Sequence, residues 1–310
     1  MEVTEAAAAP ALGRAARPPR ALVIAAFAAV YLIWGSTYLA IRFAIETIPP
    51  FFMASARFLT AGALLYAWAV THGAERPSRA HWRAATIVGA LLLVGGNGSV
   101  VWAEQRVPSG VAALLAATVP LWMVLLDWRR PGGTRPRGTV FVGIAFGLGG
   151  LALLVEPSSF VSGYATDPLG AAVLLLGSLL WAIGSIYSRH ATLPSSPILM
   201  TGIEMLAGGV LLAVTGLLFG ERHQFVLHAV SLRSGMALLY LIVFGALIGF
   251  TAYLWLLRVA SPAHVSTYAY VNPVVAVILG WALAGEPLSA RTLLAAGVIV
   301  GSVMVIGMKR

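Results

Sequence analysis

Ten long apolar stretches, arranged as two sets of five, occupy nearly all of this chain. The second set repeats landmarks of the first: Tyr31–Arg42 reads YLIWGSTYLAIR and Leu180–Arg189 reads LWAIGSIYSR, with Gly35 matching Gly184 at an offset of 149 (184 − 35). An odd number of membrane spans in each copy forces the two copies into opposite orientations. The duplication therefore predicts an inverted repeat, the architecture in which one central site can face either side of a membrane.

The composition places the chain in a lipid bilayer. Of its 310 residues, 59% are hydrophobic and 10% are charged, and its mean hydropathy is +0.89. Soluble domains are about 25% charged. The apolar stretches are much longer than the ~10 alternating residues of a membrane-barrel strand. We therefore predict an all-α integral membrane protein, with ten transmembrane helices as two inverted five-helix repeats.

Charge and residue usage exclude several functional classes. The net charge of +9 would suggest a nucleic-acid partner in a soluble protein, but here the basic residues lie in short loops and no basic domain remains. The absence of cysteine excludes disulfides and thiolate catalysis. The sequence also has no metal-binding cluster, phosphate-binding loop or paired carboxylates. We predict no enzyme activity, no catalytic residue, no cofactor and no metal.

The apolar runs set the predicted boundaries. Residues 1–20 are predicted to be a disordered cytoplasmic tail, residues 21–155 the first repeat and residues 168–308 the second repeat. The predicted spans are 21–42, 51–71, 84–104, 108–127, 138–155, 168–190, 197–219, 235–258, 262–284 and 290–308.

The distribution of arginine predicts the orientation. Most basic residues fall in the tail and in the loops on the same side of the membrane as the tail. The predicted opposite loops hold only Arg106, Arg222, Arg233 and Arg291. By the positive-inside rule, both termini are cytoplasmic.

Three segments resemble a known family. WGSTYLAIRFA (34–44), PPFFMASARFLTAGALL (49–65) and the closing NPVVAVILGWALAGEPLSARTLLAAGVIVGSVMVI (272–306) are similar to the EamA-type branch of the drug/metabolite transporter superfamily. The resemblance covers about residues 22–308, and Gly285-Glu286-Pro287-Leu288 before the last helix is its most specific part. It implies ten-helix carriers of the bacterial inner membrane, mostly exporters of amino acids, other metabolites or drugs. It also implies a central cavity lined by both halves, with the fifth and tenth helices peripheral.

The ninth predicted span is the most polar. His264, Thr267, Tyr268 and Asn272 recur at three- and four-residue spacing and therefore share a helix face. A polar stripe in a span must face protein or water. It forms either a cavity wall or interhelical hydrogen bonds, and His264 lies close enough to the cytoplasmic end to be hydrated there.

Aromatic and amide side chains give further candidates. Trp34 and Trp181 lie too deep to be interfacial anchors, so they either line the cavity or pack the bundle. Tyr38 shares a helix face with Trp34, and Tyr187 is the repeat counterpart of Tyr38. Asn97 lies mid-span between two glycines and needs a polar partner, which is either a substrate or a neighbouring backbone. The full set of predicted substrate-binding residues is Trp34, Tyr38, Asn97, Trp181, Tyr187, His264, Thr267, Tyr268 and Asn272.

Two further pairs correspond between the repeats. Glu204 is an acid within a span, which makes it a candidate for proton coupling unless it is hydrated near the cytoplasmic end. Its counterpart Arg57 is predicted in the opposite leaflet, too far away for a direct ion pair and able to extend outward to the interface. Pro120 and Pro273 are counterparts inside spans and predict either a pair of broken, hinge-like helices or two static kinks.

Small-residue faces occur in the fifth and tenth spans, at Gly143 with Gly147 and at Gly297 with Gly301. Such faces let helix backbones approach closely. They predict scaffold contacts within the chain, or alternatively a dimer seam, so both a monomer and a dimer remain open.

The predicted function is export of a small neutral metabolite by rocking of the two repeats. An uncharged cavity without clustered basic residues disfavours phosphorylated substrates. A zwitterionic amino acid with an aromatic or apolar side chain fits aromatic walls and polar helix ends. The alternatives are a multidrug exporter of the same fold and, more remotely, a membrane-embedded enzyme. The expected partners are this small substrate and the lipid bilayer, with no nucleic acid.

Overall fold

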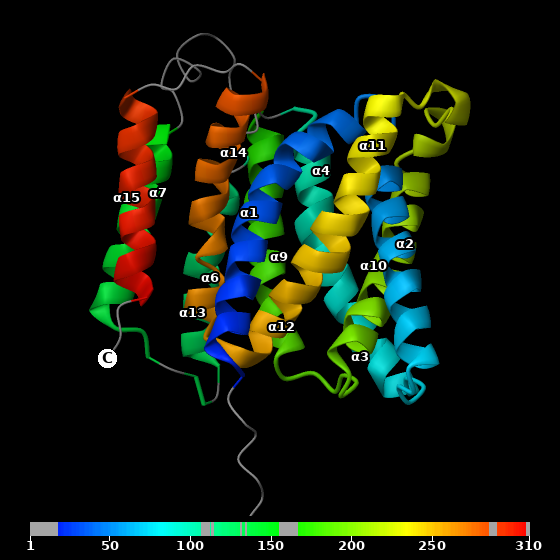
Figure 1. Cartoon of the computed structure of the whole chain (residues 1–310), viewed down its shortest axis with the longest axis horizontal. Coiled ribbons are helices and arrows are strands. Elements are labelled where there is room, and N and C mark those ends of the chain that lie inside the picture. The colour runs from blue at the N-terminus through cyan, green and yellow to red at the C-terminus, as the bar shows by residue number, and fades with distance from the viewer. Residues whose placement is uncertain are drawn as a thin grey trace, which may run out of the picture.

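The computed structural model describes residues 18–106, 112, 115–130, 132–133, 135–154, 167–284 and 290–307. The regular elements of this part of the chain are helices, which stand side by side in one bundle (Figure 1). Residues 1–17 of the predicted tail and the Gly285–Leu288 motif lie outside the described residues. Six helices are long and apolar enough to cross a membrane. The predictions of a helical and membrane-embedded fold are therefore confirmed.

Helices of the first half coincide closely with the predicted spans. The third predicted span comprises three consecutive helical segments rather than one uniform helix. The elements are α1 (Arg20–Ala44), α2 (Pro50–Thr71), α3 (Arg79–Gly89), η1 (Ala90–Gly98), α4 (Ser99–Ala103), α6 (Val119–Arg129) and α7 (Gly138–Leu154).

Helices of the second half follow the same pattern, and the predicted eighth span is again composite. The α- and π-helical elements of this half are α9 (Pro168–Ser188), α10 (Pro197–Leu218), α11 (Leu232–Tyr240), η4 (Leu241–Phe250), α12 (Thr251–Val259), α13 (Pro262–Val265), α14 (Tyr268–Ala284) and α15 (Ala290–Gly307). Two short 3-10 turns, η2 (Glu221–His223) and η3 (Leu227–Ala229), lie between α10 and α11.

Two of these segments are π-helical, which the periodicity of the sequence did not predict. They are η1 between α3 and α4, and η4 between α11 and α12. Each carries two or more glycines. Wide π-helical turns are rare and concentrate at functional sites. Both segments contribute residues to the cavity described below.

The predicted fourth and ninth spans are both interrupted near their prolines. In the fourth, a turn at Ala117–Thr118 precedes α6, so Pro120 lies in the first turn of a helix. Proline is well tolerated there because that N–H has no intrahelical partner. In the ninth, a turn at Ser266–Thr267 separates α13 from α14, and Pro273 lies inside α14. Breaks therefore occur in both spans, but each break precedes its proline.

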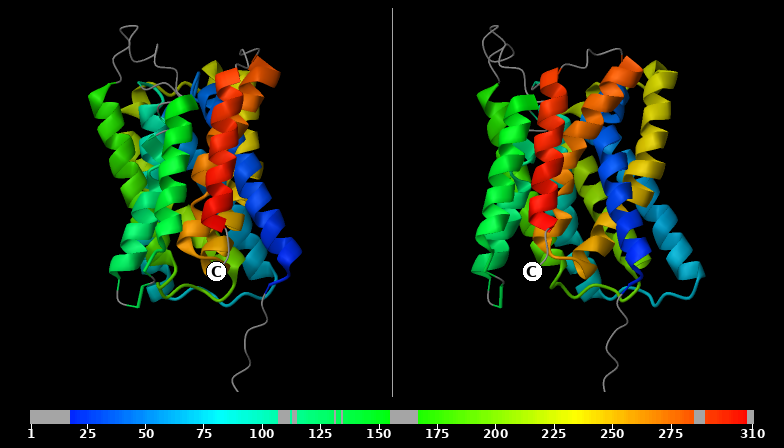
Figure 2. Two further views of the ribbon diagram at one scale, coloured as in Figure 1. Left: turned by 90° about the vertical axis from the view of Figure 1, so that its left-hand side faces the viewer. Right: turned by 60° about the vertical axis from the view of Figure 1, so that its left-hand side comes forward.

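Two helix pairs dominate the packing. The most extensive contacts join α2 to α10 and α7 to α15. The α7–α15 pair stands at one side of the bundle (Figures 1 and 2). Gly147 of α7 faces inward, since a Cβ there would lie 2.9 Å from Cε1 of Tyr270. Gly297 and Gly301 of α15 face open space, because a Cβ at either position would meet nothing within 4 Å, so neither glycine marks a close approach of helices within the described part of the chain.

Loop contacts bring several predicted outer loops together. Arg106 pairs with Asp167 at 3.3 Å, and Arg233 pairs with Glu46 at 3.4 Å. The Leu169 N–H, and after it the Arg106 guanidinium, lower the pKa of Asp167. The start of α1 and the end of α15 both lie toward the opposite end of the bundle (Figure 1).

A buried carboxylate holds the start of α2. Glu221, 3% exposed, lies in the turn after α10 and accepts the N–H groups of Phe51 at 2.9 Å and Phe52 at 2.8 Å. The first N–H groups of a helix have no partner within the helix. Burial raises the pKa of Glu221, and the two N–H donors act in the opposite direction.

Glu221→Ala is therefore expected to lower the free energy of unfolding by about 1–3 kcal/mol, because two buried N–H groups lose their acceptor. Glu221→Gln, which keeps one acceptor oxygen, should lower the free energy of unfolding by less. Thermal unfolding of the purified protein in detergent measures both. Glu46→Ala is the matched control, since Glu46 makes only an exposed ion pair. Equal melting temperatures for Glu221→Ala and Glu46→Ala would contradict this capping role.

Candidate functional site

A cavity lies in the middle of the bundle, between elements from both halves of the chain. The first half contributes α1, α2, η1, α4 and the start of α6, and the second half contributes α9, η4 and α14. The lining residues are Trp34, Thr37, Tyr38, Ile41, Arg57, Phe58, Gly96, Asn97, Val100, Ala116, Val119, Leu174, Gly177, Ser178, Trp181, Phe250, Tyr268, Ala269 and Asn272.

The structure brings most of the predicted substrate-binding residues to this cavity. Those on its wall are Trp34, Tyr38, Asn97, Trp181, Tyr268 and Asn272. Tyr187, His264 and Thr267 do not line it. Helix periodicity explains why these residues lie on the same wall, since Trp34 and Tyr38 share one face of α1, and Tyr268 and Asn272 share one face of α14.

The three remaining predicted residues have other surroundings. Tyr187 is partly buried against the main hydrophobic core. His264 is exposed in α13, where its backbone N–H donates to the Ser261 hydroxyl oxygen at 3.3 Å. Thr267 is 3% exposed and its hydroxyl donates to the carbonyl of His264 at 2.6 Å. The turn at Ser266–Thr267 displaces His264 and Thr267 from the face that Tyr268 and Asn272 share.

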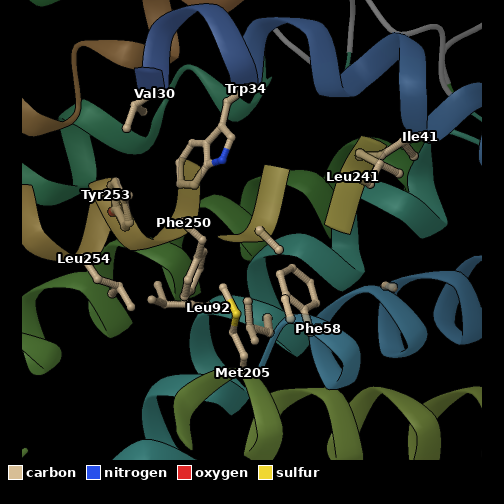
Figure 3. Close-up of a cluster of buried hydrophobic side chains, with 14 of the residues drawn as sticks. Val30, Trp34, Ile41, Phe58, Leu92, Met205, Leu241, Phe250, Tyr253 and Leu254 are labelled. Carbon is tan, nitrogen blue, oxygen red and sulfur yellow. The ribbon is translucent and has the colours of Figure 1, made fainter. Parts of the chain in front are cut away.

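Aromatic rings form one wall of the cavity. The Trp34 ring lies edge-on to Trp181, with centroids 5.6 Å apart, and to Tyr268 at 5.1 Å. It also packs against Tyr253 at 5.0 Å. Figure 3 shows Trp34 extending from α1 toward Phe250 and Tyr253. The two alternatives for the deep tryptophans are both realised, because Trp34 and Trp181 line the cavity and also pack against one another.

Hydrogen bonds fix the orientation of these rings. The Trp34 indole N–H donates to the carbonyl of Gly245 in η4 at 3.1 Å. The Trp181 indole N–H donates to the Tyr253 hydroxyl at 2.8 Å, and that hydroxyl also contacts the Ser185 hydroxyl at 2.6 Å. A wall held in this way is preorganised for a flat or apolar ligand group.

The two asparagines on the cavity wall differ. In the amide orientation that satisfies its surroundings, Asn272 donates to the carbonyls of Tyr31 at 3.2 Å and Tyr268 at 3.0 Å, and so joins α14 to α1. Asn97, in η1, has a buried side-chain oxygen with no hydrogen-bond partner. A buried polar atom without a partner is costly, so Asn97 is the amide with free capacity for a ligand.

Arg57 contradicts two of the sequence-based expectations. It is 4% exposed and lines the cavity, so it does not extend outward to the interface and the cavity is not uncharged. Its guanidinium carbon lies 4.8 Å above the Phe58 ring, and its Nη2 lies against Gly245. The position of a residue along a span indicates its depth in the membrane but not the neighbours of its side chain. Because Gly245 has no side chain, the guanidinium of Arg57 has space inside the bundle.

Glu204 lies away from the cavity, in α10 where this helix crosses Gly89 of α3. It is 0% exposed and neither carboxylate oxygen has a hydrogen-bond partner. The alternative of a hydrated side chain near the cytoplasmic end is therefore wrong. No ion pair joins Glu204 to Arg57 among the described residues.

Several cavity residues were not among the predicted site residues. Thr37 and Ile41 lie three and seven residues after Trp34, so the same helix periodicity would have found them. Phe58 and Phe250 carry no polar signal and are indistinguishable by sequence from packing residues. Glu104, which follows α4, does not line the cavity, but both of its carboxylate oxygens are buried without a hydrogen-bond partner.

Known proteins are similar to this chain in sequence and in fold. The model of the EamA-like transporter family matches residues 21–156 and 168–308. The chain is 46% identical to the uncharacterized inner membrane transporter YedA of Escherichia coli (strain K12), over 90% of this chain and 88% of that protein. It is 27% identical to a WAT1-related chloroplastic protein of Arabidopsis thaliana, over 89% and 67% of the two chains.

A solved structure has the same fold. A crystal structure of a protein that is 22% identical matches with a TM-score of 0.73, over 92% of this chain and 97% of that chain. At this identity the likeness concerns the fold alone. The family match extends over nearly the whole sequence, and the similar family members are transporters rather than enzymes. The chain belongs to the EamA-like transporter family and is a multi-pass membrane transporter, not an enzyme.

Proposed function

We propose that this transporter exports small neutral metabolites, chiefly amino acids with aromatic or apolar side chains, across a bacterial inner membrane by alternating access. The observation that carries this proposal is the cavity walled by both halves of the chain, with rings of Trp34, Trp181 and Tyr268 beside the polar group of Asn97. Rings suit an aromatic side chain, while amides suit the amino and carboxylate groups.

The proposed mechanism is rocking of two inverted five-helix repeats, residues 21–155 and 168–308. Three observations support it. The pairs α2–α10 and α7–α15 each join one helix of the first half to one of the second. The π-helical segments η1 and η4 occupy corresponding places, since Gly96 and Gly249 differ by 153 (249 − 96). The family model also matches each half separately. Both termini are proposed to be cytoplasmic, as the arginine distribution predicts.

The interruptions beside Pro120 and Pro273 are proposed as the hinges of this motion. Discontinuous helices at corresponding places in two repeats are typical of transporter sites. Tyr268 and Asn272, which line the cavity, belong to the helix that follows one of the breaks. A rotation at Ser266–Thr267 would therefore move cavity residues directly.

Counterflow in proteoliposomes tests the proposed function. Liposomes loaded with an unlabelled amino acid should accumulate the same labelled compound, with aromatic and branched-chain amino acids ahead of polar ones. Liposomes without protein provide the background. Absence of exchange for every amino acid, with exchange of a lipophilic organic cation, would refute the proposed substrate class and favour multidrug export.

The two asparagines distinguish these alternatives further. Asn97→Ala and Asn272→Ala are expected to reduce amino-acid counterflow at least about tenfold, since a hydrogen bond to a charged group contributes about 1.5–3 kcal/mol. Flux of a lipophilic dye should change by less than twofold. Asn97→Ala is the cleaner variant because Asn272 also joins two helices. Equal losses for the amino acid and the dye would oppose specific polar recognition.

Glu204 is proposed as the site of proton coupling, because a buried carboxylate without hydrogen-bond partners can bind and release a proton. Glu204→Gln is expected to abolish the response of transport to an imposed pH gradient while leaving counterflow at equal pH intact. Flux of a labelled amino acid with and without the gradient measures this. An undiminished response in Glu204→Gln would exclude the role.

A further inference from the structure

An unpaired cation faces the cavity. Arg57 of α2 is 4% exposed, lines the cavity, and has a buried Nε without a hydrogen-bond partner. None of the ion pairs in the described part of the chain includes it. A buried charge is expensive unless an opposite charge and hydrogen bonds compensate for it. Among the described protein groups, only the face of the Phe58 ring compensates the charge of Arg57, through a cation–π contact.

No carboxylate is found on the described cavity wall to neutralise this cation. Arg57 is the one ionised side chain in the described lining. Glu104 does not line the cavity. The cavity is therefore positive, and the missing counter-charge is one that a ligand can supply.

The backbone opposite Arg57 is shaped to accept its guanidinium. A Cβ at Gly245 would lie 2.6 Å from Nη2 and 3.2 Å from Cζ of Arg57, so any larger residue there would displace the group. Gly245 lies in the π-helical segment η4, and its carbonyl is held by the Trp34 indole N–H at 3.1 Å. The guanidinium and the aromatic wall are thus positioned by the same residue.

Resting on the proposed transport function, we propose that Arg57 binds the carboxylate of the transported molecule. A planar guanidinium matches a carboxylate with two parallel N–H···O bonds. Asn97, whose buried oxygen has no partner, offers an acceptor for an N–H of the same ligand. The substrates are carboxylates or amino acids with a free carboxylate, and lipophilic cations are excluded by the like charge of Arg57.

Binding to the purified full-length protein, without transport, tests this proposal. Four probes each carry a phenyl ring. L-phenylalanine and 3-phenylpropionate also have a carboxylate, whereas L-phenylalaninamide and phenethylamine do not. Isothermal titration should give a Kd at least about tenfold tighter for the first two. Arg57→Gln should weaken both carboxylates at least about thirtyfold, the effect of removing one partner of a buried charge pair, and should not weaken the amide, whose amine is repelled by Arg57 in the wild type.

Two further variants control the experiment. Arg233→Gln removes the same charge from an exposed loop pair and should leave all four affinities unchanged. Gly245→Ala keeps the charge of Arg57 but displaces its guanidinium, and should also weaken the carboxylates selectively. If Arg57→Gln does not fold, the carboxylate affinity of Gly245→Ala tests the proposed role of Arg57.

Equal affinity of the wild type for phenethylamine and 3-phenylpropionate would overturn the proposal. Carboxylate affinity within twofold of wild type in folded Arg57→Gln, or in Gly245→Ala if only that variant folds, would also do so. These outcomes differ from failure of the proposed function. Binding that depends on Arg57 but is not accompanied by any counterflow would refute export and leave the carboxylate site standing. Equal counterflow of 3-phenylpropionate and L-phenylalaninamide would support transport and refute the carboxylate site.

Discussion

Gly62→Ala is expected to destabilise the bundle and to lower the yield of folded protein. A Cβ at Gly62 of α2 would lie 2.8 Å from the backbone N of Leu206 and 2.9 Å from the carbonyl O of Gly202, both in α10. These are backbone atoms, so no side-chain rotation relieves the overlap. The α2–α10 pair is one of the two most extensive contacts in the chain, and its helices approach closely because small residues face each other.

The measurement is the yield of monodisperse protein by fluorescence-detected gel filtration, together with its melting temperature. Overpacking costs about 1–3 kcal/mol or more where the backbone has to shift, a large part of a typical stability. Gly202→Ala should behave alike, since its Cβ would lie 2.9 Å from the backbone N of Tyr66. Gly235→Ala is the matched control within a helix, with nothing within 4 Å. Similar yields for Gly62→Ala and Gly235→Ala would show that the close approach is not required.

Trp34→Ala is expected to reduce transport at least about tenfold and to lower the free energy of unfolding by about 3–5 kcal/mol, the usual cost of removing a large buried ring. Trp34 is 8% exposed and contacts the rings of Trp181, Tyr253 and Tyr268. Its loss would leave the Gly245 carbonyl without the indole donor and open the aromatic wall of the cavity.

Counterflow per reconstituted protein and thermal unfolding measure the two effects separately. Trp34→Phe should preserve most of the stability but lower transport, because the ring remains while the hydrogen bond to Gly245 is lost. Trp281→Ala is the control, as Trp281 is 52% exposed on the outside of the bundle. Retention of full transport by Trp34→Ala would show that the aromatic wall does not contact the substrate.

Local periodicity explains which site residues were predictable. Spacings of three and four residues brought Trp34 and Tyr38 to one side of α1, and Tyr268 and Asn272 to one side of α14, and the structure places these faces on the cavity. The same periodicity failed for His264 and Thr267, because the turn at Ser266–Thr267 breaks the helix between them and Tyr268. A break of this kind has no clear sequence signal, since Pro273 lies inside the following helix.

Apolar run length, charge content and the duplicated landmarks by themselves determined that this chain is a helical membrane protein, because a bilayer requires long apolar helices whatever their packing. Which side chains meet was decided only by the tertiary structure. Arg57 became a cavity residue because α2 faces Gly245 across the bundle, and Glu204 became fully buried because α10 crosses α3 at Gly89. Contacts between segments so far apart in the sequence depend on helix rotation and crossing, which no local pattern encodes.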